Sequence, residues 1–554
     1  MQNLIIGEAF DYILLFILAL LPLFYKLSFW LYTIQLKEYR FDRFKEYIFT
    51  KQGKSALFNI FFILELFLLV YYLMIWGIYF SENVYNIAFW GIGYNIMFYY
   101  LVILNIFVIG KIFRKRILKP KFTGRLILLL SLFIILGGFE LYYFIKLNLF
   151  NYVYIYILSV FLLMPVIIFF YNFISLPLVN YKKNKQINSA IKKSKNPLSG
   201  EIKQIKIGIT GSYGKSSVKE FLSSILEQNG ETLKTPENKN TEMSVSALVL
   251  NKLNNKFKYF VAEMGAYKIG EISLLGKIVN HKYGFLTAIG NQHIGLFGSQ
   301  ENIAKGKFEI YESVVKNNGI LYVNGESPHL ASPLRERDNM KNIILYGIKS
   351  ENILDAQSEI INTENGKTKF SFSYKNIKSE FEINLIGEHN VVNITGIIAC
   401  CIDLGLKIED IKRYLKNLKT PDSSKTIIES GNNILIDDTY NLSEAGLKSG
   451  LDLFKNYSSE YKKRLVLDDI LELGKQSENI HKNIGKKIAE EKIVDQILFC
   501  GFNYKKNFIE GLLEGGFNKK NIILNLNEIS EKSVILFEGR NAKKYLNKYL
   551  KENK

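Results

Sequence analysis

A glycine loop followed by a lysine and two serines is the segment best suited to chemistry. It runs Gly211-Ser-Tyr-Gly214-Lys215-Ser216-Ser217 and follows the short apolar strand that we expect over Ile205–Thr210. Glycines let backbone N–H groups close around phosphate oxygens, and the start of a helix behind them adds positive potential. In such a loop Lys215 reaches the terminal phosphates and Ser216 can hold Mg²⁺. The segment predicts a nucleoside triphosphate site, although Ile209 replaces the first glycine of the common motif.

Polar side chains also follow two other apolar segments that are typical of buried strands. Glu263 lies at the end of Tyr259–Met264, and Asn291-Gln-His293 follows Tyr283–Ile289. A carboxylate at a strand end beside a phosphate loop is well placed to bind Mg²⁺. Helical spacing of apolar residues follows the loop itself, at Val218, Phe221, Leu222, Ile225 and Leu226. This alternation predicts a mostly parallel, doubly wound sheet with its site at the strand ends.

A second series of strands and helices begins near residue 426. Its expected strands are Ile434–Ile436, Arg464–Leu467, Gln496–Cys500 and Val534–Phe537. Before them, residues 368–374 and 379–385 alternate polar and apolar side chains around a polar turn, which indicates a hairpin. We therefore expect a central α/β ATP-binding domain over residues 203–422 and a C-terminal, Rossmann-like α/β domain over residues 423–554.

The first 180 residues have the composition of a membrane domain. Their apolar runs are about as long as the roughly 20 residues that cross a bilayer as a helix. Five such runs are present, namely Tyr12–Leu36, Ala56–Phe80, Ile87–Gly110, Leu126–Ile145 and Tyr152–Leu176. Glu65 lies within the second run, where an ionisable group is expected to be buried and hydrogen-bonded between helices or to serve a function. Residues 181–202 are polar and are predicted to be a linker.

Charges between the apolar runs predict the orientation of this domain. Residues 1–200 carry 21 Lys and Arg against 8 Asp and Glu, which is most of the net charge of +19 of the chain. The basic residues gather in alternate loops, around residues 37–54, 111–125 and 182–195. By the positive-inside rule the N-terminus lies outside and everything after about residue 178 lies in the cytoplasm. The uneven charge excludes a uniformly basic nucleic-acid binder.

The motifs of the soluble part, taken in order, resemble the Mur ligase superfamily and most closely its MurF type. The segments that carry this resemblance are 210–216, Thr235-Pro-Glu-Asn-Lys-Asn240, Ala262-Glu-Met-Gly-Ala266 with Gly270-Glu-Ile272, 291–293, Phe297–Lys305, Lys307-Phe-Glu-Ile310, Gly387-Glu-His-Asn390 with Asn393, Asp437-Asp-Thr-Tyr-Asn441 and Leu471-Glu-Leu-Gly474 with His481. They span residues 203–554. The resemblance implies an ATP-dependent, ADP-forming amide ligase of peptidoglycan precursor synthesis. Its substrates would be a muramyl-peptide and D-Ala-D-Ala or a similar amine, and no nucleic acid.

The resemblance also implies roles for individual residues. In this family ATP phosphorylates a carboxylate, and an amine attacks the acyl phosphate. Lys215, Ser216 and Glu263 would then hold the phosphates and one Mg²⁺, His293 a second Mg²⁺, and Lys307 would be carbamoylated and help to bind metal. The nucleotide would be bound through Thr210, Gly211, Gly214, Ser217, Asn390, Asn393, Lys425 and Asp438.

Several positions depart from the family pattern. Lys425 replaces an arginine, Asp468 replaces the glycine of a Gly-Asp-Met-Leu-Glu segment that reads Asp468-Asp-Ile-Leu-Glu472 here, and Glu538 replaces the lysine of a Lys-Gly-Ser segment. Because the resemblance implies that the amine substrate binds near all three positions, the identity of that amine stays open. The MurF type also has an N-terminal domain that binds UDP, and here the membrane domain takes its place.

Three functions therefore remain to be compared. The first is a membrane-tethered MurF-like ligase. The second is another Mur-type ligase, such as a poly-γ-glutamate synthetase or an enzyme that acts on a lipid-linked precursor. The third is an ATP-driven transporter or signalling protein, for which we find no second nucleotide-binding motif.

Overall fold

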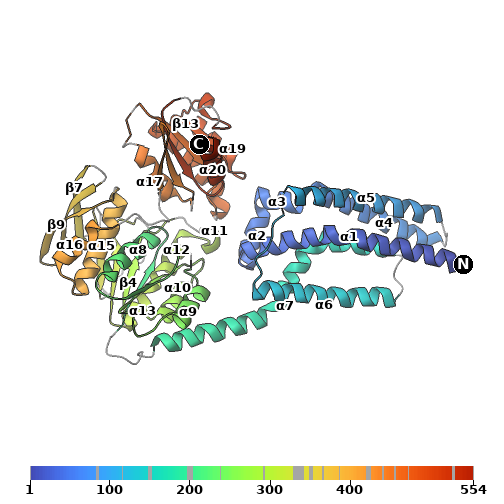
Figure 1. Cartoon of the computed structure of the whole chain (residues 1–554), viewed down its shortest axis with the longest axis horizontal. Coiled ribbons are helices and arrows are strands. Elements are labelled where there is room, and N and C mark those ends of the chain that lie inside the picture. The colour runs from blue at the N-terminus through green and yellow to red at the C-terminus, as the bar shows by residue number, and fades with distance from the viewer. Residues whose placement is uncertain are drawn as a thin grey trace. The chain divides into compact units, whose positions relative to one another are not determined.

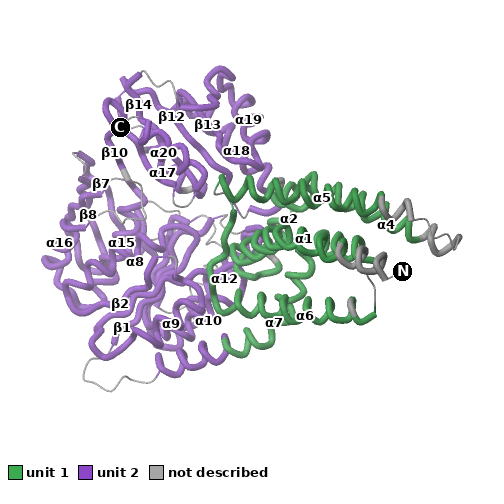
Figure 2. Tube along the Cα trace, turned by 45° about the vertical axis from the view of Figure 1, so that its right-hand side comes forward, with its two compact units in different colours: residues 1–182 green, residues 183–554 purple. Residues whose placement is uncertain are grey.

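The structure is a computed structural model in which the chain forms two compact units, residues 1–182 and 183–554 (Figures 1 and 2). It describes the chain apart from residues 1, 83–86, 115–116, 148–151, 196–203, 238, 291–293, 328–341, 349–353, 365–366, 386, 419–425, 440–441, 455–456, 459, 472, 527–530 and 553–554. The first unit is helical, and the second contains two β-sheets with their helices.

Long apolar helices make up most of the first unit, because four of the five apolar runs lie within one helix each, the last of them from Val153 onward. The second run, Ala56–Phe80, is helical from Ile60 onward after a break at residues 58–59. The helices are α1 (Gln2–Leu36), α2 (Phe41–Phe49), α3 (Lys51–Leu57), α4 (Ile60–Glu82), α5 (Ile87–Phe113), α6 (Gly124–Lys146) and α7 (Val153–Lys195). By length and composition, four described segments can cross a membrane: Asp11–Leu36, Ile92–Phe113, Gly124–Phe144 and Val153–Lys195. The described apolar part of α4, Ile60–Trp76, is shorter. The predicted helical domain is therefore confirmed, with four spans rather than five meeting these criteria.

Glu65 of α4 is fully buried between helices of this unit. It forms an ion pair with Lys26 of α1, and the Tyr100 hydroxyl of α5 donates a hydrogen bond to it over 2.7 Å. The Lys26 ammonium lies 4.9 Å from the ring centroid of Phe161 on α7. A buried charge is tolerated when it is paired and hydrogen-bonded. The expectation of a hydrogen-bonded glutamate between helices is thus confirmed, and the group joins α1, α4 and α5.

Helix α7 continues well beyond its apolar part. Residues 181–195, predicted to begin a linker, extend this helix to Lys195, and the rest of the expected linker, residues 196–202, is outside the described residues. Ile187 and Ala190 are buried in a hydrophobic cluster of the second unit, and Ile191 packs against the same cluster. Their spacing places them on one face of the helix, which explains why this polar stretch remains helical. The domain limits at residues 180, 202 and 422 stay predictions.

Polar contacts hold the same end of α7 to the α/β core. Lys183 forms an ion pair of 2.5 Å with Glu242, the first residue of helix α9 (Glu242–Asn251). Ser194 Oγ donates to the Val279 carbonyl over 2.8 Å, and the Lys206 ammonium donates to the Ser194 carbonyl. Residues 183–195 are therefore a packed element of the second unit and not a free connection.

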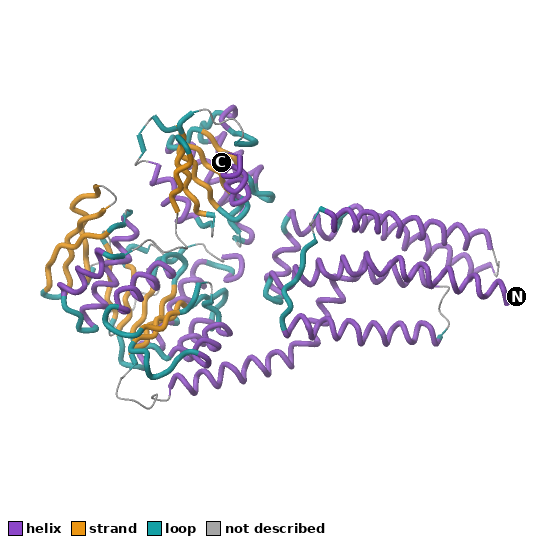
Figure 3. The backbone as a smooth tube through the Cα atoms, viewed as in Figure 1, coloured by secondary structure: helices purple, strands orange, loops and turns teal. Residues whose placement is uncertain are grey.

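The larger of the two sheets in the second unit has nine strands (Figure 3). Its order is β2-β3-β1-β4-β5-β6-β7-β8-β9; the first seven are parallel and the last two antiparallel. The strands are β1 (Ile205–Thr210), β2 (Thr232–Lys234), β3 (Tyr259–Glu263), β4 (Tyr283–Leu286), β5 (Ile320–Asn324), β6 (Ile343–Gly347), β7 (Ala356–Glu364), β8 (Lys367–Tyr374) and β9 (Ile377–Ile383). The chain passes from β3 to β4 across β1, which makes the end of β1 a topological switch point.

Helices cover both faces of this sheet, because alternate residues of the central strands enter different hydrophobic clusters. Tyr259 and Val261 of β3 belong to one cluster, and Phe260 and Ala262 belong to the other. The first cluster also contains buried residues of α8 (Lys215–Glu227), α15 (Glu388–Asp403) and α16 (Ile408–Lys416). The second contains those of α9 (Glu242–Asn251), α10 (Glu271–Val279), α11 (Ile294–Phe297), α12 (Gln300–Phe308) and α13 (Ile310–Lys316).

The second sheet has five strands in the order β10-β11-β14-β12-β13, parallel except for β10. They are β10 (Thr426–Ser430), β11 (Asn433–Asp438), β12 (Lys462–Leu467), β13 (Gln496–Phe499) and β14 (Ser533–Glu538). Its helices are α17 (Glu444–Phe454), α18 (Ser477–Glu491), α19 (Lys505–Glu514) and α20 (Ala542–Glu552), with short 3₁₀ turns at Gly474–Gln476 and Lys519–Asn521. The structure confirms the predicted α/β fold around each of the two sheets.

Most differences from the sequence-based prediction concern the extent of strands. Strand β4 ends at Leu286, three residues before the predicted Ile289, because the chain turns there to contact the phosphate loop. The predicted hairpin forms between β8 and β9, but its turn is only Lys375-Asn376, with Lys375 at a φ of 53°. A two-residue turn with positive φ matches the twist of the paired strands.

Candidate functional site

The phosphate loop lies between the end of β1 and the start of α8, and its glycines are required by its shape. Gly211 has a φ of +147°, and a Cβ there would lie 2.0 Å from Thr287 Oγ1. Gly214 precedes Lys215, the first residue of α8, with a φ of +83° in the left-handed region. The loop is fixed to the end of β4, because the amides of Ser212 and Tyr213 both donate to the Ala288 carbonyl.

Lys215 folds back over this loop. Its ammonium donates to the carbonyls of Gly211 at 2.8 Å and Ser212 at 3.0 Å. Burial lowers the pKa of Lys215, and the nearby Glu263 carboxylate opposes this effect. The predicted lysine thus lies where a phosphate bound in the loop would meet its positive charge.

Glu263 at the end of β3 has polar partners on three sides. Ser216 Oγ donates to Glu263 Oε2 over 3.0 Å, and Asn240 Nδ2 donates to Oε1 over 2.9 Å. The Glu263 amide donates to Thr235 Oγ1 over 2.9 Å. Because β1 and β3 are adjacent, with Ile209 opposite Glu263, the register itself brings the carboxylate to the loop. The predicted association of Lys215, Ser216 and Glu263 is present.

The oxygens of Ser216 and Glu263 are suitable for Mg²⁺. Magnesium binds oxygen ligands at about 2.1 Å in octahedral geometry, which places neighbouring ligands about 3 Å apart. The 3.0 Å between Ser216 Oγ and Glu263 Oε2 matches this spacing. Among the described residues no group of three or more His, Cys, Asp and Glu gathers to hold a metal. A site with one carboxylate that completes its shell with phosphate and water is what Mg²⁺ usually takes.

Lys219 is a residue of this site that our sequence analysis did not identify. Its side chain is 1% exposed, and its ammonium lies 3.0 Å from Glu220 Oε1 and 3.6 Å from Glu263 Oε2. Glu220 in turn pairs with Lys234 on β2 at 2.8 Å. Lys219 follows Lys215 by four residues, so helical spacing alone places both on one face of α8. That both lysines lie near the carboxylate of Glu263 depends instead on the pairing of β1 with β3.

Lys307 lies on α12 and is only 2% exposed. Its ammonium donates to the Ala266 carbonyl over 3.1 Å, in the segment that follows Glu263. Burial lowers the pKa of Lys307 well below its usual value, and the charge of Lys215 lowers it further. A buried lysine with a depressed pKa is not a solvated surface residue, and it has access to the neutral amine form that can react with CO₂.

The remaining predicted nucleotide contacts are distributed over several elements. Asn393 on α15 lies beside the phosphate loop, since a Cβ on Gly214 would be 3.3 Å from its Oδ1. Thr210 ends β1, Ser217 belongs to the first turn of α8, Asn390 to the first turn of α15, and Asp438 ends β11 in the second sheet. His293 and Lys425 are outside the described residues. The roles of these residues stay predictions.

Two motifs of the C-terminal sheet order their own loops. Asp469 accepts hydrogen bonds from the amides of Phe502, Asn503 and Tyr504. His481 is buried, and its Nε2 accepts the Ile470 amide over 3.0 Å, so its Nδ1 carries the proton that is donated to the Ser477 carbonyl. Burial lowers the pKa of His481, which keeps the ring neutral. These contacts give the motif residues a structural role.

Comparisons with known proteins agree on one family. The model of the Mur ligase middle domain matches residues 209–401. The UDP-N-acetylmuramoyl-tripeptide–D-alanyl-D-alanine ligase of Bacillus subtilis is 30% identical over 347 residues, which cover 61% of this chain and 73% of that enzyme. The crystal structure of MurF from Acinetobacter baumannii superposes with a TM-score of 0.59 at 25% identity, covering 67% of this chain and 80% of that chain.

A further structure shows the same fold with nucleotide bound. MurF ligase of Thermotoga maritima in complex with ADP has a TM-score of 0.56 at 24% identity, and 67% of this chain and 84% of that chain are covered. The phosphate loop, Glu263 and Lys307 all lie within the matched middle domain. The chain therefore belongs to the Mur ligase family of ATP-dependent ligases.

Proposed function

We propose that the protein is a membrane-tethered, MurF-like ligase that adds D-Ala-D-Ala or a similar amine to a muramyl-peptide during peptidoglycan precursor synthesis. The observation that carries this proposal is the joint placement of Lys215, Ser216 and Glu263 at the switch point of the sheet. The similarity to the Bacillus subtilis enzyme supplies the substrate class.

The proposed chemistry proceeds through an acyl phosphate. A carboxylate oxygen of the acceptor attacks the γ-phosphorus of ATP and ADP leaves. The amine nitrogen then attacks the acyl carbon, loses a proton, and phosphate leaves as the amide forms. Negative charge accumulates in both steps, so cations fixed beforehand lower both barriers. Lys215 supplies one such charge. Mg²⁺ held by Ser216 and Glu263 would neutralise phosphate oxygens.

Lys307 is proposed to act as a carbamate. Its neutral amine attacks the carbon of CO₂ and loses one proton, which converts a buried cation into an anion. Two observations support this: burial lowers its pKa, and its ammonium lies beside the segment that carries Glu263. A carbamate there would complement the magnesium ligands, as would His293.

The first unit is proposed to be a multi-pass anchor in the cytoplasmic membrane. Its apolar helices have the length to span the bilayer, and the basic loops alternate as the positive-inside rule requires. In the proposed topology the N-terminus lies outside and the ligase lies in the cytoplasm, where ATP is available. A poly-γ-glutamate synthetase, a ligase that acts on a lipid-linked precursor and a transporter would each yield a product different from that of the proposed ligase.

Product analysis tests the proposal directly. Full-length protein in detergent is offered ATP, Mg²⁺, a UDP-muramyl-tripeptide and D-Ala-D-Ala, and mass spectrometry follows the pentapeptide and ADP. We expect amide formation that Lys215→Ala abolishes and Lys252→Ala, a change at an exposed lysine after α9, leaves intact. Product formation by Lys215→Ala at the wild-type rate would overturn the proposed role of the loop. ATP hydrolysis without any requirement for an amine would favour transport or signalling.

A further inference from the structure

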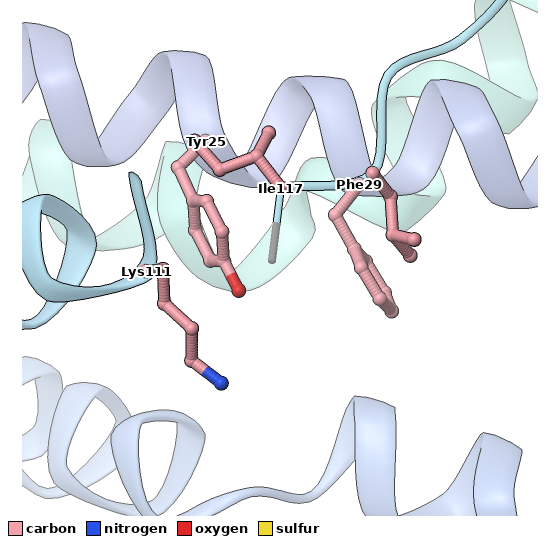
Figure 4. A pocket seen from close by; sticks show the side chains of 5 residues that line it. Tyr25, Phe29, Lys111 and Ile117 are labelled. Atoms are coloured by element: carbon pink, nitrogen blue, oxygen red, sulfur yellow. The ribbon is translucent and has the colours of Figure 1, made fainter. Parts of the chain in front are cut away.

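A cavity of about 310 Å³ lies within the first unit, apart from the ligase site. It is lined by Tyr25 and Phe29 of α1, by Lys111 of α5, and by Ile117 and Leu118 of the segment after α5 (Figure 4). Three of its walls are apolar side chains. The cavity is large enough for a phosphate-sized group together with the first atoms of an attached chain.

Two polar groups converge on this space. In Figure 4 the Tyr25 hydroxyl and the Lys111 ammonium extend toward the same opening, and the Phe29 ring lies along it. Lys111 contacts the Phe107 ring at 5.1 Å from its centroid, and among the described residues no carboxylate forms an ion pair with it. Nor does the Tyr25 hydroxyl hydrogen-bond to any residue described in the structure. An ammonium beside a phenol hydroxyl, with no acid in the lining, is suited to an anion.

The packing around the cavity holds both groups in place before any ligand binds. The Tyr25 ring packs edge-to-face on Phe107 at 6.3 Å, and Phe107 packs on Phe61 of α4 at 4.8 Å. Ser28 Oγ donates to the Leu118 carbonyl over 2.9 Å, which fixes the outer wall. A site whose side chains are already positioned loses less entropy when it binds.

The surroundings indicate what kind of anion fits. Lys111 is in the last turn of α5, at the end that leads into a basic loop, and such loops lie at the cytoplasmic surface of the bilayer. Exposed apolar side chains occur nearby in sequence, with Phe113 and Phe122 each 82% exposed. The anions available at that depth, next to hydrocarbon, are the phosphoryl headgroups of lipids.

We propose that this cavity binds the phosphoryl headgroup of a membrane lipid, with Lys111 and Tyr25 on the phosphate oxygens and Phe29, Ile117 and Leu118 against the start of the lipid chain. The inference goes beyond the ligase activity and does not depend on it. It gives the first unit a ligand of its own in addition to its role as an anchor.

Lipid binding to the full-length protein in detergent tests the site. The probe is dioctanoyl phosphatidic acid, titrated and followed by native mass spectrometry, with dioctanoylglycerol as the phosphate-free comparison. Loss of one hydrogen bond to a charged group weakens binding about tenfold or more. We expect this from both Lys111→Gln and Tyr25→Phe, while Lys111→Arg retains binding. Lys146→Gln, at an exposed lysine beside two tyrosine rings on α6, is the matched control and should bind as the wild type does.

Two results would overturn the proposal. One is equal binding of phosphatidic acid by the wild type, Lys111→Gln and Tyr25→Phe. The other is binding of inorganic phosphate as tight as that of the lipid and equally sensitive to Lys111→Gln, which would assign the cavity to free phosphate. Tyr25→Phe keeps the ring that packs on Phe107, and retained binding by Lys111→Arg shows that the first unit tolerates a change at position 111, so loss of lipid binding in Tyr25→Phe and Lys111→Gln is then specific to the polar groups of the cavity.

Discussion

Replacement of the buried Lys219 should destabilise the ligase core far more than replacement of an exposed lysine whose ion pair is just as short. In Lys219→Met the methionine fills nearly the same volume, so little packing is lost. What is lost is the positive charge between Glu220 and Glu263, at 3.0 Å and 3.6 Å. Glu263 is itself 5% exposed, so water cannot take the place of the ammonium.

The magnitude follows from burial. Removal of one partner from a buried ion pair leaves the other charge uncompensated and costs about 3–5 kcal/mol. That is a large share of the roughly 5–15 kcal/mol by which a domain is stable. Glu220 keeps Lys234 as a partner, so most of the loss should come from Glu263. The double variant Lys219→Met/Glu263→Gln should recover part of the loss, because the carboxylate that loses its buried partner is then neutral.

Hydrogen exchange of the amides of β1 and β3 in the full-length protein measures this free energy. The matched control is Lys369→Met, which removes an even shorter ion pair, 2.7 Å to Glu380, from the exposed hairpin. We expect no measurable change there, because solvent screens an exposed pair. If Lys219→Met and Lys369→Met had the same effect on exchange, the argument from burial would be refuted.

Three other outcomes are expected. Lys307→Ala should lower ligase activity by about 100-fold or more, with partial rescue by short carboxylic acids. The control Lys305→Ala, on the exposed face of α12, should stay active. A fully active Lys307→Ala enzyme would exclude the carbamate. Burial lowers the pKa of His281 to about 4, so the unfolded chain takes up a proton first and stability falls as the pH drops from about 6.5 toward 4. Hydrogen exchange should show a loss of about 2 kcal/mol between pH 7 and 5 that is absent in His281→Gln. A chain that begins at residue 203 lacks the buried Ile187, so it should melt at a lower temperature than a chain that begins at residue 183. Equal melting temperatures would show that the end of α7 is not part of the core.

The elements around the phosphate loop could be predicted from sequence because their signals are local. Strand β1 has the predicted bounds, and all five apolar residues expected on the core side of α8 are buried. The loop glycines and Glu263 follow directly from this pattern. Where a glycine loop and regularly spaced apolar residues occur within about 20 residues of each other, the sequence is sufficient to predict the local elements.

Other features depend on contacts that sequence does not contain. The pairing of Lys219 with Glu263 requires β1 and β3 to be neighbours in a given register. Strand β10 has one antiparallel partner and an exposed Ile427, so its pattern is weak. Helix α7 was missed beyond residue 181 because the many lysines hide a short apolar face at Ile187, Ala190 and Ile191.

The continuity of α7 has a consequence for modular exchange. The boundary between the two units falls within one helix, and residues 183–195 on its far side are bonded to α9 and to the end of α10. Glu242, the partner of Lys183, is two residues from Asn240, which contacts Glu263. A chimera that grafts another membrane segment onto this ligase should therefore keep residues 183–195 and join at residue 182. The grafted helix should join in helical phase, so that Ile187 keeps its place on the buried face of α7.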